Sequence, residues 1–196
     1  FMRHYFLVAK DVGDLTRIVC SALEVQQLTK APALKELLTP AGWRKRAQLR
    51  KTSDFRIDNG RINVVDDQVF ERDPVNMIRL FWRGDKHNVM FHPDAFRLIR
   101  TSLKLINAKV RKDKEANELF LKLLTSPANP EVALRRMNEA GVLGRFVPSF
   151  GKVVSMMQFN MYHHYTVDAH LIRTVGILSD IEHGRCADDH PVSTEL

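Results

Sequence analysis

Proline residues that follow a capping side chain divide the middle of the chain into short segments. The pairs Asp73-Pro74, His92-Pro93 and Asn129-Pro130 each stand before apolar residues spaced three and four apart. Proline is favoured at the first position of a helix because its φ is already helical and no N–H donor is needed there. Apolar residues at that spacing line one face of a helix. The middle of the chain is therefore predicted to be α-helical.

Helices are also predicted at both ends and between these starts. Residues 2 to about 28 form one long amphipathic pattern, and residues 114–126, KEANELFLKLLTS, form a shorter one. The apolar positions of the long pattern are Phe6, Ala9, Val12, Leu15, Val19, Ala22 and Val25. Thr166, with Asp168 two residues later, is predicted to cap a last helix. Gly141 is expected to end the helix before it, and the following VLGRFVPSFGK to form short turns.

One segment has the alternation of a β-hairpin. In FRIDNGRINVV, residues 55–65, Phe55 and Ile57 alternate with polar neighbours, and the alternation resumes after Asn59-Gly60. Asn-Gly is a strong signal for a type I′ hairpin turn because both residues tolerate positive φ. Two strands alone are marginally stable, so the hairpin must pack on a helix. The predicted fold is mainly α, a helical bundle with one small β-hairpin at about residues 54–65.

The composition is that of an ordinary globular protein. Hydrophobic residues make up 44% of the 196 residues and charged residues 27%, and no apolar run is long enough to cross a bilayer. The first residues carry charges too early for a secretory signal. The two cysteines, Cys20 and Cys186, are far apart and suggest neither a disulfide framework nor a zinc ribbon. We expect a cytoplasmic protein without a membrane segment.

The net charge of +7 includes one dense basic cluster in WRKRAQLRK, residues 43–51. One interpretation is an anion-facing patch that binds phosphate or nucleic acid. The other interpretation is a solvated connector. Two observations favour it: residues 29–52 have weak periodicity, and no aromatic residues are interleaved with the basic ones. The candidate anion-facing residues are Arg44, Lys45, Arg46, Arg50 and Lys51.

Complete catalytic motifs are missing from the sequence. A nucleotidyltransferase needs a Gly-Ser turn for the triphosphate and two carboxylates, usually Asp-x-Asp, for Mg²⁺. The chain has neither. Its adjacent acids, Asp66-Asp67 and Asp188-Asp189, point apart on any regular element, so they are interpreted as solvated turns. P-loop, GxGxxG and GxSxG motifs are also missing.

Histidines gather in MMQFNMYHHYTVDAH, residues 156–170. Imidazole is a common ligand of transition metals, so His163, His164 and His170 are candidate ligands. His170 borders the predicted apolar face of the last helix, where a hydrogen-bonded boundary histidine is more common than a ligand. His163 and His164 are consecutive and usually point apart, so their role stays open.

Three stretches resemble one enzyme family. They are MRHYFLVAKDVGDLTRI at the start, FHPDAFRLIRTSLKLI in the middle, and RRMNEAGVLGRFVPSFGKVVSMMQFNMYHHYTVDAHLIRTV at residues 135–175. Together they resemble the bifunctional uridylyltransferase/uridylyl-removing enzymes of bacterial nitrogen control. Those enzymes combine a nucleotidyltransferase domain, a helical domain, an HD-type phosphohydrolase domain and two ACT domains. They attach UMP from UTP to the PII signal protein when glutamine is scarce, and remove it when glutamine is plentiful.

The resemblance implies that this chain is an interior piece of such an enzyme. Residues 1–150 would be the helical domain associated with the nucleotidyltransferase, and residues 151–196 the N-terminal part of a truncated HD domain, with its first helix or helices. His170 matches the first metal ligand of HD enzymes, but none of the eight histidines precedes aspartate, as the family's later His-Asp dipeptide requires. One imidazole cannot hold a catalytic metal. We therefore expect the chain alone to be catalytically inactive and to bind no Mg²⁺ or other divalent metal stably outside the intact enzyme.

The resemblance also implies that the intact enzyme uses the PII protein, UTP and glutamine, and neither a membrane nor nucleic acid. Two alternatives stay open. A glutamine-synthetase adenylyltransferase has a related helical domain, although it lacks the HD domain that YHHYTVDAH indicates; a basic helical module could instead bind nucleic acid or protein. The helix from Thr166 would carry an apolar stripe without its usual partners, so we expect it to dock on the helical domain or to pair between chains.

Overall fold

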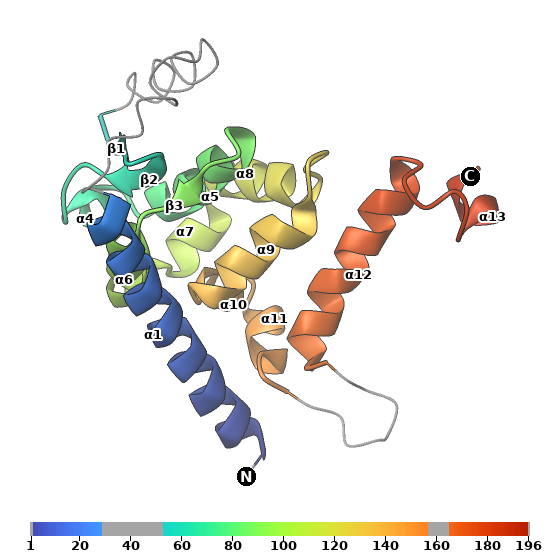
Figure 1. Cartoon of the computed structure of the whole chain (residues 1–196), viewed down its shortest axis with the longest axis horizontal. Coiled ribbons are helices and arrows are strands. Elements are labelled where there is room, and N and C mark those ends of the chain that lie inside the picture. The colour runs from blue at the N-terminus through green and yellow to red at the C-terminus, as the bar shows by residue number, and fades with distance from the viewer. Residues whose placement is uncertain (1, 29–52, 157–164, 196) are drawn as a thin grey trace.

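The computed structural model describes residues 2–28, 53–156 and 165–195 (Figure 1). The predicted connector at residues 29–52, with the five candidate basic residues, lies outside the described residues, as do His163 and His164. The prediction of a mainly α-helical chain is confirmed. The helices are α1 (Met2–Leu28), α4 (Val69–Arg72), α5 (Asn76–Lys86), α6 (Pro93–Ser102), α7 (Ala108–Lys112), α8 (Lys114–Leu124), α9 (Pro130–Glu139), α10 (Val142–Phe146), α11 (Pro148–Val153), α12 (Val167–Glu182) and α13 (Pro191–Thr194).

The helix starts follow the predicted caps closely. The His92 ring accepts a hydrogen bond from the Asp94 N–H at the start of α6, and the Asn129 side chain accepts one from the Val132 N–H at the start of α9. Asp73 differs, because its carboxylate accepts from the Val75 N–H in a turn, and α5 begins only at Asn76. The segment predicted to form turns after Gly141 contains the short helices α10 and α11, so that prediction was wrong.

The hairpin has the predicted register and turn. Strand β1 (Phe55–Asp58) pairs antiparallel with β2 (Arg61–Val64), with Ile57 opposite Ile62. Asn59 has φ 49° and Gly60 φ 75°, the two positive values that a type I′ turn requires. A strand that was not predicted, β3 (Met90–Phe91), pairs parallel with β2 and makes the sheet three-stranded.

The β3 strand depends on a close contact with α5. A Cβ atom placed on Gly84 of α5 would lie 2.5 Å from Cζ of Phe91, so the Phe91 ring reaches the helix backbone only because residue 84 is glycine. Phe91 also packs against Phe81 and Phe96, with ring centroids 5.2 and 5.4 Å away. Such tilted and edge-on aromatic pairs add to the stabilisation from burial. This contact attaches the sheet to the helices.

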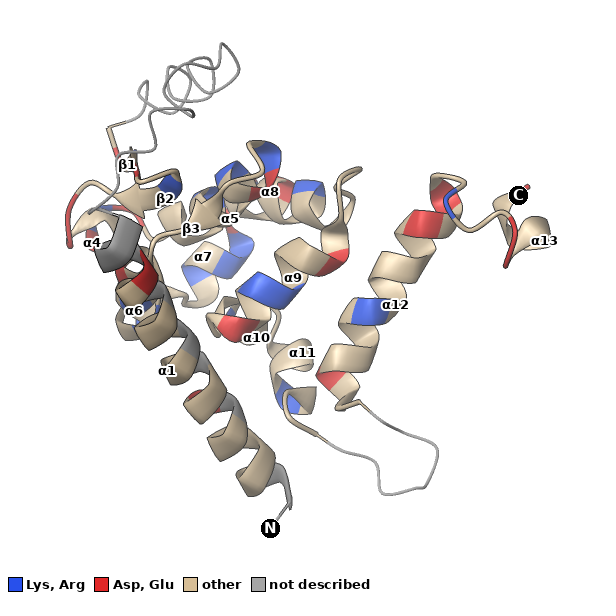
Figure 2. Ribbon diagram, in the orientation of Figure 1, with Lys and Arg blue, Asp and Glu red and all other residues tan. Residues whose placement is uncertain are grey.

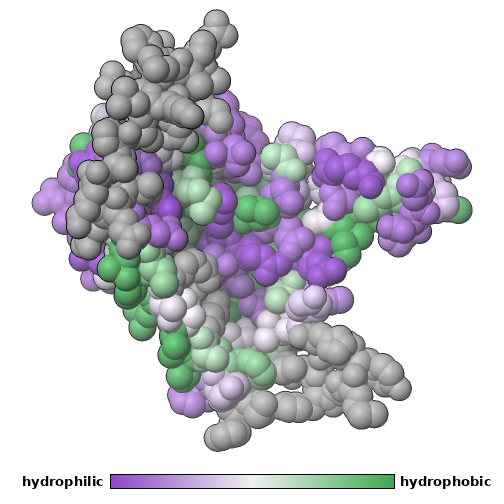
Figure 3. Space-filling view, viewed as in Figure 1, coloured by the Kyte–Doolittle hydropathy of each residue, from purple (hydrophilic) through white to green (hydrophobic). Residues whose placement is uncertain are grey.

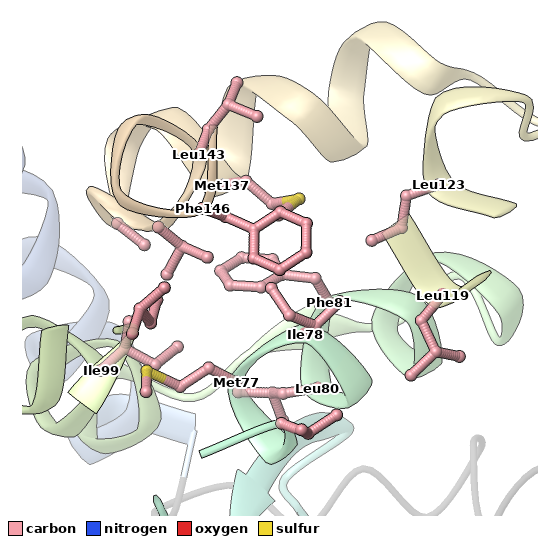
Figure 4. Packing of buried hydrophobic residues seen from close by; sticks show 14 of the residues in the cluster. Met77, Ile78, Leu80, Phe81, Ile99, Leu119, Leu123, Met137, Leu143 and Phe146 are labelled. Carbon is pink, nitrogen blue, oxygen red and sulfur yellow. The ribbon is translucent and has the colours of Figure 1, made fainter. Parts of the chain in front are cut away.

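The hydrophobic core is built around α5, which packs on both α8 and α9 (Figure 4). Most apolar side chains of α5 are almost fully buried, and the core residues around them come from α6, α8, α9 and α10. The core residues labelled in Figure 4 are Met77, Ile78, Leu80, Phe81, Ile99, Leu119, Leu123, Met137, Leu143 and Phe146. Helix α6 covers β2 and α4. Apart from Ile172 of α12, the buried hydrophobic residues of the core lie between residues 55 and 146.

Helix α1 lies against α6 at one side of this core (Figure 1). Ion pairs attach it, including Asp11 with Arg100 at 3.1 Å and Glu24 with Arg61 at 3.0 Å. Its predicted apolar face is only partly used, since Val12, Leu15 and Val19 are 56–58% exposed. Figure 3 shows hydrophobic surface along this helix. Among the described elements, α6 alone gives α1 an extensive contact, so most of that face stays open to solvent.

Candidate functional site

The candidate metal ligand His170 lies in the first turn of α12 (Figure 1). This helix packs against α9 and α11. Thr166 occupies the N-cap position, as predicted, but its side chain accepts no capping hydrogen bond. The start of the helix is held instead by the backbone. The Val167 N–H donates to the Met156 carbonyl at 2.7 Å.

A buried carboxylate fixes this helix start to the rest of the molecule. Asp168 is 3% exposed. One of its oxygens accepts a hydrogen bond from the Ser155 N–H at 3.1 Å, and the other accepts one from Nδ2 of Asn138 on α9 at 2.9 Å. Ser155 itself has φ 56°, an uncommon backbone conformation for a residue other than glycine. A buried charge needs such hydrogen bonds to offset its desolvation.

Because Asp168 faces inward, His170 faces outward. Successive residues of a helix turn by about 100°, so side chains two positions apart lie on nearly opposite faces. His170 is exposed, and its backbone N–H and carbonyl are used within the helix by Thr166 and Thr174. His170 was predicted to border the buried face of this helix, but it lies on the exposed side instead.

The outer face of α12 next to His170 is apolar and uncovered by the described residues. Leu171 is 43% exposed, Ile177 40% and Leu178 60%, while Ile172 on the inner side is 2% exposed. A groove of about 340 Å³ lies between α12 and the helices α8, α9, α10 and α11. Its lining is almost wholly apolar, with Phe120, Leu124, Leu134, Leu143, Val147, Phe150, Leu171, Ile172, Thr174 and Val175 around it.

The described residues do not by themselves form a metal site around His170. No group of three His, Cys, Asp or Glu side chains within the described ranges has a geometry that could hold an ion. Asp168, the nearest acid in sequence, is committed to Ser155 and Asn138. Any metal held by His170 would need its other ligands from outside these residues.

The other acids behave as surface groups. Both oxygens of Asp66 accept from the Arg72 guanidinium at 2.9 Å, and this pairing lowers the pKa of Asp66. Asp188 and Asp189 are exposed. Both pairs of adjacent acids are exposed and lie in bends or turns, as predicted.

Asp168 is the site residue whose role the sequence pattern missed. The pattern assigned it to the start of the helix, where a negative charge complements the helix dipole. Its partner Asn138 carried a usable signal, because it lies in α9 beside the buried Met137. A polar side chain on a buried helix face needs a hydrogen-bond partner. The predicted domain boundary at residues 150 and 151 falls within α11 and stays a prediction.

A comparison with known protein families found a match for the part of the chain that contains most of the core. Residues 55–146 match the family model of the uridylyltransferase GlnD third domain. The matched range runs from β1 to the end of α10 and so covers the sheet and the core helices, while α12 lies beyond it. No solved structure matched the chain. Within the described residues, no helix is long and apolar enough to cross a membrane. Residues 55–146 therefore form a domain similar to the third domain of the uridylyltransferase GlnD.

Proposed function

We propose that this chain is part of an enzyme that attaches UMP from UTP to the PII signal protein when glutamine is scarce and removes it when glutamine is plentiful. The observation that carries the proposal is the match of residues 55–146 to the uridylyltransferase GlnD third domain. The resemblance of the YHHYTVDAH segment to HD-type phosphohydrolases extends it to uridylyl removal. Residues 1–150 serve as the helical domain beside the nucleotidyltransferase, and residues 151–196 begin the hydrolase domain.

His170 is the residue of this chain that we assign to the hydrolase site. It is exposed at the head of the apolar face formed by Leu171, Ile177 and Leu178. Whatever element covers that face in the intact enzyme is brought next to the imidazole, because apolar surface of this kind is normally buried against a partner. The remaining ligands of Mg²⁺ or another divalent metal come with that element. Asp168 positions His170 by holding the helix start on α9.

The chain alone is proposed to be inactive in both reactions. It contains no Gly-Ser turn, no Asp-x-Asp pair and no His-Asp dipeptide. A catalytic metal needs about three protein ligands and an open position. The purified chain, supplied with uridylylated PII and Mg²⁺ or Mn²⁺, should release no UMP above the rate without protein. Metal-dependent release would contradict the proposal.

The assignment of His170 is tested in the intact enzyme. His170→Ala should lower UMP release from uridylylated PII by at least about 100-fold, because the metal loses a ligand. Transfer of UMP from UTP to PII should continue, since the two reactions use different domains. His190→Ala, at another exposed histidine, is the matched control and should leave both rates unchanged. Equal losses in both variants, or no loss in His170→Ala, would remove His170 from the site.

The same uncovered face of α12 is proposed to pair with a second copy in the 196-residue chain. Leu178 is 60% exposed and Leu171 43%, and their burial between two chains would remove apolar surface from water. Leu178→Glu should shift the sedimentation of the chain toward monomer. Leu121→Glu, at a leucine of α8 that is 56% exposed, is the control and should leave the sedimentation unchanged. A chain that is monomeric before substitution would exclude the pairing.

A further inference from the structure

Arg83 on α5 is a partly buried cation with an unsatisfied donor. Its guanidinium lies over the Phe55 ring, 5.6 Å from the centroid. The Nε atom is buried and has no hydrogen-bond partner, the one such side-chain atom found in the described part of the chain. Native proteins leave few buried donors unpaired, and each one needs a physical explanation.

The charges around Arg83 do not neutralise it. Burial lowers the pKa of Arg83, the nearby Arg79 lowers it further, and Asp54 offsets this only in part. Arg79 itself forms ion pairs with Asp73 and Glu115. An uncompensated charge in a partly dry position is unfavourable and is relieved by an opposite charge.

Two further cations flank the ring of Trp82, the residue before Arg83 on α5. The Lys86 Nζ lies 4.7 Å from the Trp82 centroid, and the Lys122 Nζ of α8 lies 5.8 Å from it. Figure 2 shows basic positions on α5 and α8, and these two helices pack together. Asp85 is the acid next to this group, and it already accepts a hydrogen bond from Ser126. Lys86 and Lys122 thus add two basic groups on α5 and α8 beside Trp82.

We propose that Arg83, Lys86 and Lys122 receive the carboxylates of an acidic segment of a partner protein. A carboxylate matches a guanidinium through two parallel hydrogen bonds, and the partly buried Arg83 favours a small planar anion. The two lysines beside Trp82 bind a second carboxylate of the segment. Bound in this way, the segment gives the Arg83 guanidinium the opposite charge that it lacks.

Nucleic acid fits this surface less well than an acidic peptide. Binding to single strands uses an aromatic face on which bases stack, whereas Trp82 is partly buried and flanked by its own lysines. Acids stand among the cations, including Asp54, Asp85 and Glu115. A continuous phosphate backbone would be repelled by them, while separate carboxylates can avoid them.

The test uses hexaglutamate with blocked ends as the probe and Trp82 fluorescence as the readout. The chain has two tryptophans, so a Trp43→Phe background leaves Trp82 as the only reporter. We expect a saturable change in emission on titration. Arg83→Gln should weaken the affinity at least tenfold. Arg97→Gln, which removes an exposed arginine from α6, makes the same charge change elsewhere and should alter the affinity less than twofold.

Thermal unfolding of the free chain gives a second measurement. Arg83→Met keeps much of the side-chain volume and removes the unpaired charge, so Tm should rise by about 2–5 °C. A fall in Tm would mean that Arg83 is already neutralised within the chain and would overturn the proposal. The proposal would also be overturned by no saturable signal, by equal loss in Arg97→Gln, or by tighter Arg83-dependent binding of oligo(dT) than of hexaglutamate.

Discussion

Asn138 on α9 donates a hydrogen bond of 2.9 Å to the buried carboxylate of Asp168 on α12, thirty residues further along the chain. Asp168 also accepts a hydrogen bond from the Ser155 N–H. This polar contact thus helps to hold the start of α12, which carries His170, on α9.

Asn138→Ala should loosen α12 more than the rest of the chain. The substitution removes one of the two donors to a buried carboxylate, and a lost hydrogen bond to a charged group costs about 1.5–3 kcal/mol. Hydrogen exchange should speed up in α12 more than in α5, and urea unfolding should show the lower stability. Thr174→Ala, an exposed change on the same helix, should cost less than about 0.5 kcal/mol. Equal exchange rates in α12 of both variants would contradict the anchoring role of Asn138.

Two glycines in helices should respond in opposite directions to the same substitution. Gly176 of α12 is buried against α9, where an added Cβ would lie 2.6 Å from Oε2 and 2.9 Å from Cβ of Glu131. Gly176→Ala should therefore cost about 1–3 kcal/mol through overpacking, despite the better helix propensity of alanine. An added Cβ at Gly13 of α1 meets nothing within 4 Å. Gly13→Ala should raise stability by about 0.5–1 kcal/mol in urea unfolding. Stabilisation by both changes would show that α12 does not pack on Glu131.

The hairpin turn is expected to be sensitive to substitution of Gly60, because this residue has positive φ. Gly60 has φ 75°, a conformation that costs other residues about 1–2 kcal/mol. Gly60→Ala should lower the free energy of unfolding by that amount, whereas Gly60→Asn should recover part of it because asparagine tolerates positive φ. Equal stability of the two variants would argue against strain in the turn. An added Cβ at Gly60 has no neighbour within 4 Å, so a steric clash is not involved.

The parts of the fold that were predictable have local causes. The turn at Asn59-Gly60, the caps at His92 and Asn129 and the left-handed Gly141 each depend on a few adjacent residues. Strand β3 depends instead on the contact of Phe91 with Gly84 and on its pairing with β2. Two residues are too few for an alternating pattern, so that strand could not be predicted.

Part of the candidate site was also predictable from the sequence, and part depends on contacts between distant residues. The resemblance identified His170, and helical geometry explains its exposure once Asp168 is known to face inward. The inward direction of Asp168 depends on Ser155 and Asn138, which no sequence spacing connects to it. Arg83 was missed because a periodic pattern marks it as a surface residue of α5. Its unpaired Nε becomes evident only when β1 places Phe55 beneath it.

The ion pair of Arg79 with Glu115 should make stability depend on pH in the acid range. The Arg79 guanidinium donates two hydrogen bonds to the Glu115 carboxylate, which lowers the pKa of Glu115 from its ordinary value of 4.5. A carboxyl group with a lowered pKa in the folded state contributes stability above its unfolded pKa and loses it as the pH falls through the folded pKa. Glu115→Gln should therefore be less stable than the native chain at pH 7, by less than about 1 kcal/mol because the pair is half exposed and screened by solvent.

The difference between the native chain and Glu115→Gln should shrink as the pH falls below about 4.5 and vanish below the lowered pKa of Glu115. It should also shrink at high salt, because exposed charges are screened. Urea unfolding of both proteins from pH 7 to pH 3 measures this difference in the free energy of unfolding. Glu118→Gln is the matched control on the same helix, since Glu118 lies 3.9 Å from a lysine that is 92% exposed. A difference that persists at pH 3 would mean that Glu115 stabilises the fold through packing, and the link that it makes between α5 and α8 would then not be electrostatic.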